Sequence, residues 1–120
     1  MNKDKDPQGK SLALLAYGSA IFLYFHLIVF VAVLGVAILL NLNKNRPFAV
    51  FHHRQMLGIA CIAFLITAFG NILPYGWIAL LLISLIVLMA VLGFIDAYKN
   101  QTTPLPAVGE QFQKWFTFIK

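Results

Sequence analysis

Three long apolar stretches dominate the chain, and none of them contains Asp, Glu, Lys or Arg. They cover residues 12–40, 56–73 and 75–95. Each is long enough to cross about 30 Å of hydrocarbon as a helix. The segment NILPYGW separates the second stretch from the third, because Pro74 cannot continue helical hydrogen bonding and Gly76 eases a turn. The pattern therefore predicts an all-α integral membrane protein with three transmembrane helices in a single domain, residues 1–120.

The first stretch admits a second interpretation. A break at residues 24–26 would turn it into a re-entrant pair and place all nine basic residues on one side. Each half would then form only about 20 Å of helix, and no Pro or Gly marks the turn. We therefore expect one span over 12–40, with His26 inside the membrane. There, His26 is either a functional polar group or a packing residue that hydrogen-bonds a neighbouring helix through Thr67 or Ser84.

Residues 46–55 form a polar connector before the second span. Pro47 suits a first helical turn, and four residues recur on one face of the helix that follows: Phe48, Phe51, His52 and Gln55. This face is half apolar and half polar, which predicts an interfacial helix at the level of the lipid headgroups. In that position Arg54 reaches lipid phosphate, and the two phenylalanines reach acyl chains.

The connector histidines also raise the question of a metal site. His52 and His53 are adjacent, hence about 100° apart on a helix, and no Cys, Asp or Glu lies nearby in sequence. We therefore expect no metal and no other cofactor. Instead, His52 and Gln55 are expected to form a hydrogen-bonding pair, with His53 facing water.

The C-terminal segment, residues 106–119, has helical periodicity. Its apolar positions fall on one face: Val108, Phe112, Trp115, Phe116 and Ile119. The opposite face is polar, so the pattern predicts an amphipathic helix that lies in the membrane plane and contacts lipid or a partner. A tail that packs back on the connector as a lid would use the same residues.

Composition agrees with a membrane protein, since 61% of residues are hydrophobic, 11% are charged and the mean hydropathy is +0.84. With three spans, the connector and tail would share one side and the head would lie on the other. Six basic residues against three then predict a cytoplasmic connector and C-terminus. No Ser/His/Asp arrangement, phosphate-binding glycine loop or carboxylate pair is present, so we expect no enzymatic activity.

Two segments resemble a known family. PFAVFHHRQML is similar to the connector signature of the Tic-twenty-like family, the small bacterial relatives of the chloroplast inner-envelope import component, and LGFIDAYKNQTTPLPAVGEQFQKWF is similar to the end of those proteins. On this match Phe48, Phe51, His52 and Gln55 carry the first signature. The second is carried by Gly93, Ala97, Pro106 and Gly109. Met56 stands where alanine is usual in the family.

The resemblance implies a small helical protein of the bacterial inner membrane, related to an import component. Two functional classes follow. The first is a non-enzymatic accessory or scaffold subunit of a larger envelope complex, such as a protein-translocation machine. The second is an oligomeric small-solute or proton pathway with His26 as its polar step. The expected partners are the lipid bilayer and other membrane subunits, with a homo-oligomer left open and no nucleic acid.

Overall fold

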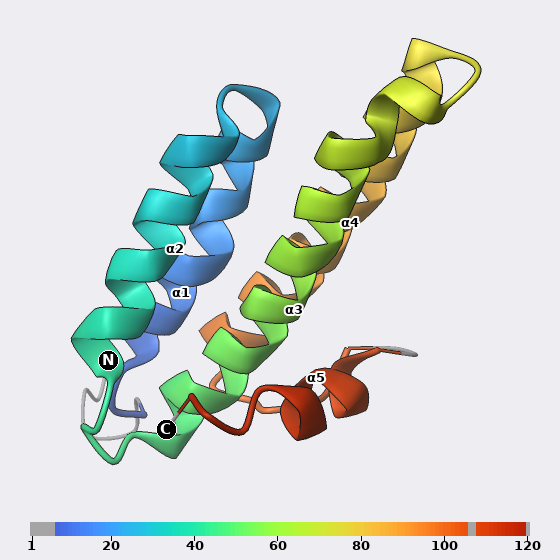
Figure 1. Cartoon of the computed structure of the whole chain (residues 1–120). Coiled ribbons are helices and arrows are strands. Elements are labelled where there is room, and N and C mark those ends of the chain that lie inside the picture. The colour runs from blue at the N-terminus through green and yellow to red at the C-terminus, as the bar shows by residue number, and fades with distance from the viewer. Residues whose placement is uncertain (1–6, 106–107, 120) are drawn as a thin grey trace.

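The computed structural model describes residues 7–105 and 108–119, and all regular structure in these residues is helical. Two helical hairpins are followed by a short helix (Figure 1). The elements in chain order are α1 (Lys10–Gly18), the 3₁₀ helix η2 (Ser19–Tyr24), α2 (Leu27–Asn41), α3 (Pro47–Phe69), the 3₁₀ helix η3 (Gly70–Ile72), α4 (Gly76–Tyr98) and α5 (Gly109–Trp115).

The first apolar stretch is a hairpin, so the prediction of one continuous span over 12–40 is wrong. Helix α1 tightens into η2, the chain reverses at Phe25 and His26, and α2 begins at Leu27. His26 has an extended backbone, and its Nδ1 accepts a hydrogen bond from the Ile28 N–H at 3.2 Å. The histidine therefore acts as the N-cap of α2 and supplies the helix start that neither Pro nor Gly marks in the sequence.

The second hairpin forms where the sequence predicts it. Pro47 occupies the first turn of α3, and the NILPYGW segment provides η3 and the turn before α4. The connector 46–55 is not a separate interfacial helix, because residues from Pro47 onward are the first turns of α3 itself. Two helices are long and apolar enough to cross a membrane, Pro47–Ile72 and Gly76–Tyr98. The arms of the first hairpin are shorter, at about 22 Å each.

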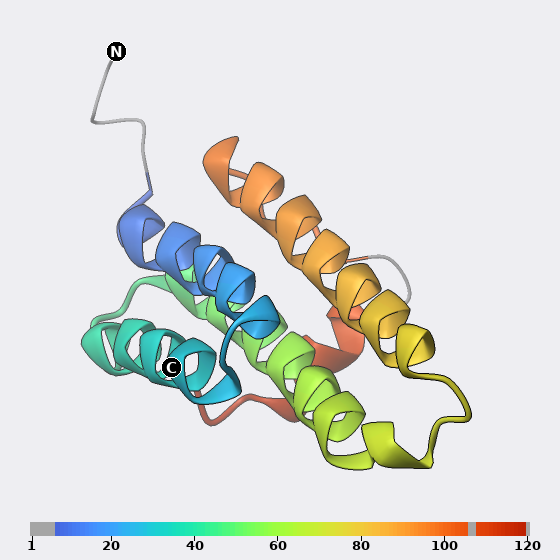
Figure 2. The same cartoon turned by 90° about the horizontal axis from the view of Figure 1, so that it is seen from above.

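Both hairpin turns lie at one end of the molecule, and the remaining segments gather at the other end (Figures 1 and 2). We call this second end the base; it comprises the start of α1, the α2–α3 connector, the first turns of α3, the end of α4, and α5. A side-chain carbon on Gly9 would lie 2.7 Å from the Ala49 side chain, and Lys10 Nζ lies 5.0 Å from the Tyr98 ring centroid. The start of α1 is thus beside α3 and α4, at the same end as the connector and tail, whereas the three-span prediction placed it at the opposite end; residues 1–6 of the predicted head lie outside the described residues.

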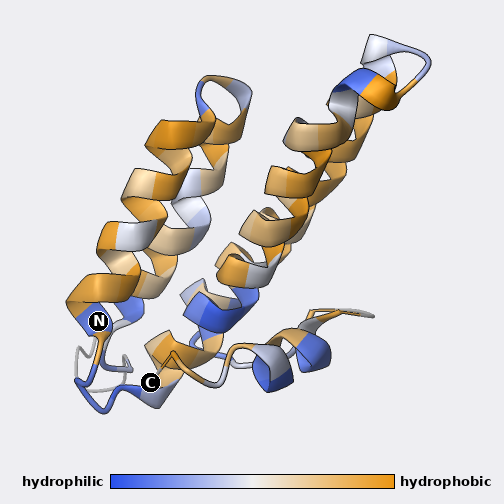
Figure 3. Cartoon of the chain, in the orientation of Figure 1, coloured by the Kyte–Doolittle hydropathy of each residue, from blue (hydrophilic) through white to orange (hydrophobic). Residues whose placement is uncertain are grey.

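Charge and apolar surface are separated along the molecule. All six lysines and arginines among the described residues belong to the base: Lys10, Lys44, Arg46, Arg54, Lys99 and Lys114. The hairpins above the base are apolar, as Figure 3 shows. In the most apolar window of each long helix only 28% and 17% of residues are buried. Most of that apolar surface therefore faces outward.

Candidate functional site

A buried polar cluster lies at the base, where α1 and α3 meet the segment after α4. It contains three side chains with no exposed surface or almost none: Tyr17, His52 and Gln55. Tyr17 comes from α1, and the other two are one turn apart on α3. His52 and Gln55 are on one face as the sequence predicts, but the prediction that they hydrogen-bond each other is wrong, because Tyr17 lies between them and bonds both.

The hydrogen bonds of this cluster fix the direction of every donor. Gln55 Nε2 donates to Tyr17 Oη over 2.9 Å, so the tyrosine hydrogen is available to His52 Nδ1, which lies 2.6 Å away. His52 then carries its proton on Nε2 and donates it to the Gln101 carbonyl at 2.8 Å. Gln55 Oε1 accepts from the Leu105 N–H at 2.7 Å. The chain of bonds is complete with a neutral imidazole and joins three separate segments.

Aromatic rings enclose the histidine of the cluster. The rings of Phe48, Phe51 and Tyr17 meet His52 edge-on, with centroid distances of 4.6, 5.1 and 5.3 Å. Phe48 is buried, so it does not reach acyl chains as the sequence suggested. Its role is to exclude water from the hydrogen bonds, which strengthens them.

Small residues allow the close approach on which the cluster depends. A methyl group at Gly93 on α4 would overlap the Tyr17 ring, and one at Gly109 would lie 2.7 Å from Gln55 Oε1. Ala97, also on α4, is fully buried. Residues of both family signatures thus surround one site. Pro106, which also belongs to the second signature, lies outside the described residues.

His53 is buried, so the prediction that it faces water is wrong. Its side chain has no exposed surface, and Nε2 lies 3.2 Å from the Leu12 carbonyl of α1. Nδ1 has no hydrogen-bond partner among the described residues. The sequence argument failed because it considered only one partner surface for α3, whereas α1 packs on a second face.

The C-terminal segment packs on α3 as a lid. Phe112 is buried where Gly58 leaves room for its ring, and Gln113 Nε2 donates to the Phe51 carbonyl at 2.7 Å. Arg54 Nε and Nη2 donate to the Ile119 carbonyl at 3.2 and 2.9 Å. The helix is shorter than the predicted 106–119 and ends at Trp115. Arg54 therefore holds the end of the lid, and its contact with lipid phosphate stays a prediction.

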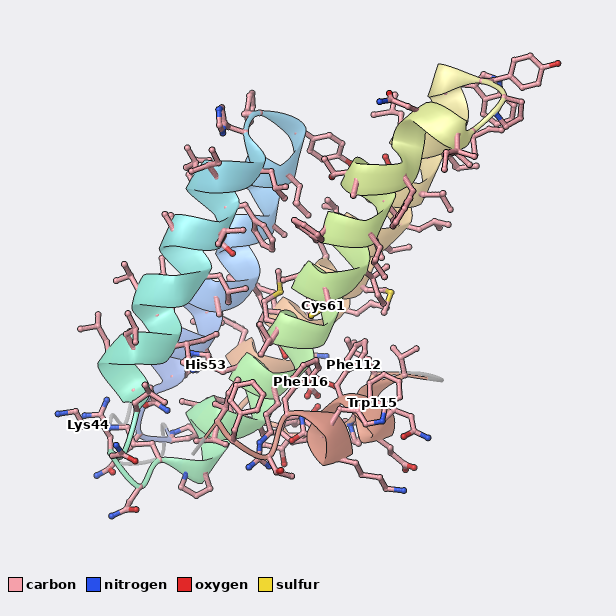
Figure 4. The ribbon with its side chains drawn as sticks, viewed as in Figure 1. Lys44, His53, Cys61, Phe112, Trp115 and Phe116 are labelled. Carbon is pink, nitrogen blue, oxygen red and sulfur yellow. The ribbon has the colours of Figure 1, made fainter. Side chains whose placement is uncertain are left out.

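The lid keeps part of its aromatic surface outside. Phe112 and Ile119 are 3% and 2% exposed, whereas Trp115 and Phe118 are 65% and 68% exposed. Phe116 is partly buried against the core, and Figure 4 shows how the three labelled aromatics of the lid lie below α3. The predicted apolar face is therefore divided between the protein's own core and the outside.

His26 belongs to the opposite end of the molecule. It lies exposed at the turn of the first hairpin, and its imidazole bonds the Ile28 N–H rather than Thr67 or Ser84. Ser84 instead accepts from the Tyr24 hydroxyl at 3.0 Å, and Thr67 donates to the Ala63 carbonyl of its own helix. The expectation of a histidine buried midway along a span is wrong, because the span itself is interrupted there.

The cluster holds three segments of the chain together through its hydrogen bonds, and we call it the clamp. It contains a phenol, a neutral imidazole and an amide, all engaged by one another or by backbone groups. Within residues 7–105 and 108–119, no group of three or more His, Cys, Asp or Glu side chains is placed to hold a metal ion. No family model, curated protein or solved structure matches this chain.

Proposed function

We propose that the protein is a non-enzymatic subunit of a membrane complex, held in the bacterial inner membrane by α3 and α4. The observation that carries this proposal is the outward-facing apolar surface of the two long helices, which are only 28% and 17% buried in their most apolar windows. A core helix of a water-soluble protein would bury most of such surface, and contiguous exposed apolar patches mark contact with lipid or protein. The first hairpin packs beside them and enters the same apolar layer.

The base is the cytoplasmic side in this proposal. All six described basic side chains belong to it, and the two hairpin turns carry none. Cytoplasmic flanks of membrane helices are enriched in Lys and Arg. An even number of helices entering from the base keeps both ends of the described chain on that side.

A role as a subunit is supported by the outer side of the lid. Trp115 and Phe118 expose about two thirds of their surface although their neighbours in the lid are anchored on α3. Exposed aromatics on a firmly held segment suit a partner's groove, since interface energy concentrates in buried Trp and Tyr anchors. The basic base would place such a partner in or next to the cytoplasm.

Membership of the Tic-twenty-like family is part of the same proposal. It is supported by the convergence of His52, Gln55 and Gly93 on Tyr17, with Gly109 packed against Gln55, which would give both signatures one structural purpose. Kinship with an import component would make protein translocation the natural setting for the complex. Fold kinship transfers an activity less securely than an architecture, so the partner has to be found directly.

The test is affinity copurification from membranes in a mild detergent. We expect the full chain to resist extraction from membranes by alkaline carbonate and to retain a stoichiometric partner. Trp115→Ala should release that partner without changing the thermal stability of the protein. Trp77→Ala is the matched control, because Trp77 is equally exposed but lies at the start of α4, beside the hairpin turn at the other end. A membrane-bound monomer with no partner would exclude the subunit role, and carbonate-soluble protein would exclude the membrane location.

A further inference from the structure

A basic recess of about 520 Å³ opens at the base beside the start of α3. Two arginines line it, Arg46 and Arg54, together with Phe51 and Gln113. Their charges have different surroundings. Arg54 directs Nε and Nη2 to backbone carbonyls of the lid, whereas the Arg46 guanidinium makes no hydrogen bond or ion pair with another described residue.

The recess therefore holds two positive charges, and none of the described residues that line it carries a carboxylate to balance them. Asp96 instead accepts the N–H of Thr103, at the end of α4. A pair of guanidinium groups with unfilled donor positions matches the oxygens of a phosphate group, which guanidinium binds in a bidentate manner.

An apolar groove of about 460 Å³ lies farther along α3, between α3 and α2. We call it the seam; its walls include Leu34, Gly35, Cys61 and Leu65. Cys61 follows Arg54 by seven residues, and Leu65 follows Cys61 by four, so all three share one face of α3. The helical rise from Arg54 to Cys61 is about 10 Å. The seam is open at Gly35, where an added side-chain carbon would meet nothing within 4 Å.

We propose that the recess and the seam together bind one anionic phospholipid, with its phosphate between Arg46 and Arg54 and an acyl chain along the seam. Charge decides the occupant: a transmembrane helix of a partner would fill the seam but leave both guanidinium groups unbalanced. Basic pockets beside membrane helices on the cytoplasmic side are suited to anionic headgroups. The inference shares the membrane location of the proposed function but does not depend on a partner protein.

The experiment is native mass spectrometry of the full chain released from detergent micelles, titrated with dioleoyl phosphatidylglycerol. Dioleoyl phosphatidylcholine, which has the same acyl chains and no net charge, is the reference lipid. We expect one phosphatidylglycerol to be retained over phosphatidylcholine. The double substitution Arg46→Gln and Arg54→Gln should reduce this preference roughly tenfold, as expected when charge-assisted contacts to phosphate are lost. Lys99→Gln with Lys114→Gln removes the same charge elsewhere at the base and should leave the preference unchanged.

The seam is tested separately with Gly35→Leu, which fills the groove without touching the arginines. This variant should also lose the retained lipid, whereas Gly18→Leu, at an equally open glycine on α1, should keep it. Arg46→Gln alone tests the recess without loosening the lid. Equal loss in the lysine pair would show diffuse attraction and overturn the proposal. Displacement of the lipid by glycerol phosphate, a headgroup without chains, would also overturn it, because the acyl chain would then contribute nothing. A dimer that Gly35→Leu dissociates would overturn it as well, since a second copy would then occupy the seam.

Discussion

At the scale of single residues, the cluster around His52 illustrates how buried polar groups constrain one another. Each of the three side chains donates one hydrogen bond of the network and accepts another. Removal of any one of them therefore leaves a polar group of a neighbour without its partner. An unpaired polar group costs more in a dry, aromatic-lined site than at the surface. The clamp is therefore strongest while all of its bonds exist together.

Removal of one hydroxyl tests this coupling. Tyr17→Phe leaves His52 Nδ1 without a donor and Gln55 Nε2 without an acceptor, and we expect a loss of about 1–3 kcal/mol in the free energy of unfolding. The measurement is thermal or denaturant unfolding in detergent micelles. Tyr24→Phe is the control, because it removes an equivalent hydroxyl whose bond to Ser84 is exposed, and it should change stability by less than about 0.5 kcal/mol. Equal effects of the two substitutions would contradict the clamp.

Sequence reasoning found part of this site. The helical spacing of His52 and Gln55 places them on one face, and the structure confirms that they belong to one network. Tyr17 was missed because it is 35 residues away from His52 in sequence. The apolar residues around Tyr17 give no indication of which distant side chain its hydroxyl bonds. A phenol within an apolar run was the available signal, since a buried hydroxyl needs a hydrogen-bond partner.

At the scale of elements, the lid depends on the absence of a side chain at Gly58. A methyl group there would overlap the Phe112 ring, so Gly58→Ala should displace Phe112 and free the lid from α3. We expect faster proteolytic cleavage after Lys114 while α3 and α4 stay folded. Gly35→Ala places the same methyl group in open space and should leave cleavage unchanged, with a stability gain of up to about 1 kcal/mol from helix propensity. Identical cleavage of both variants would show that Phe112 does not anchor the lid.

The elements also show where sequence patterns stop being informative. The second hairpin was predictable because Pro74 and Gly76 mark its turn, and Pro47 marks the start of α3. The first hairpin was not, because its turn uses a 3₁₀ helix and a histidine cap, for which apolar periodicity gives no sign. Likewise, the tail pattern predicted an amphipathic helix but did not distinguish membrane contact from a lid, since both bury the same face.

At the scale of the whole molecule, charge distribution was the better guide to topology than helix length. The re-entrant interpretation gathered every basic residue on one side, and the described part of the chain shows this arrangement at the base. Helix length argued against it, because each arm of the first hairpin is too short to cross about 30 Å alone. The structure resolves the conflict by packing the short hairpin against two helices that are long enough.

This arrangement predicts a specific labelling pattern in intact cells. In a Cys61→Ala background, single cysteines at Gln8 and Gln101 should both resist an impermeant thiol reagent added from outside, because both positions belong to the basic base, which we propose to be cytoplasmic. A cysteine at Asn71, in the turn of the second hairpin, should react, because in the proposed arrangement α3 and α4, both long enough to cross a membrane, carry it to the other side. Permeabilised cells provide the control, since all three positions are exposed in the fold and should then react. A cysteine at Phe25 reports how far the short hairpin reaches: reaction from outside would show that it crosses the membrane, and protection would show that it ends inside. Reaction at Gln8 with protection at Gln101 would restore a three-span topology and contradict the shared base.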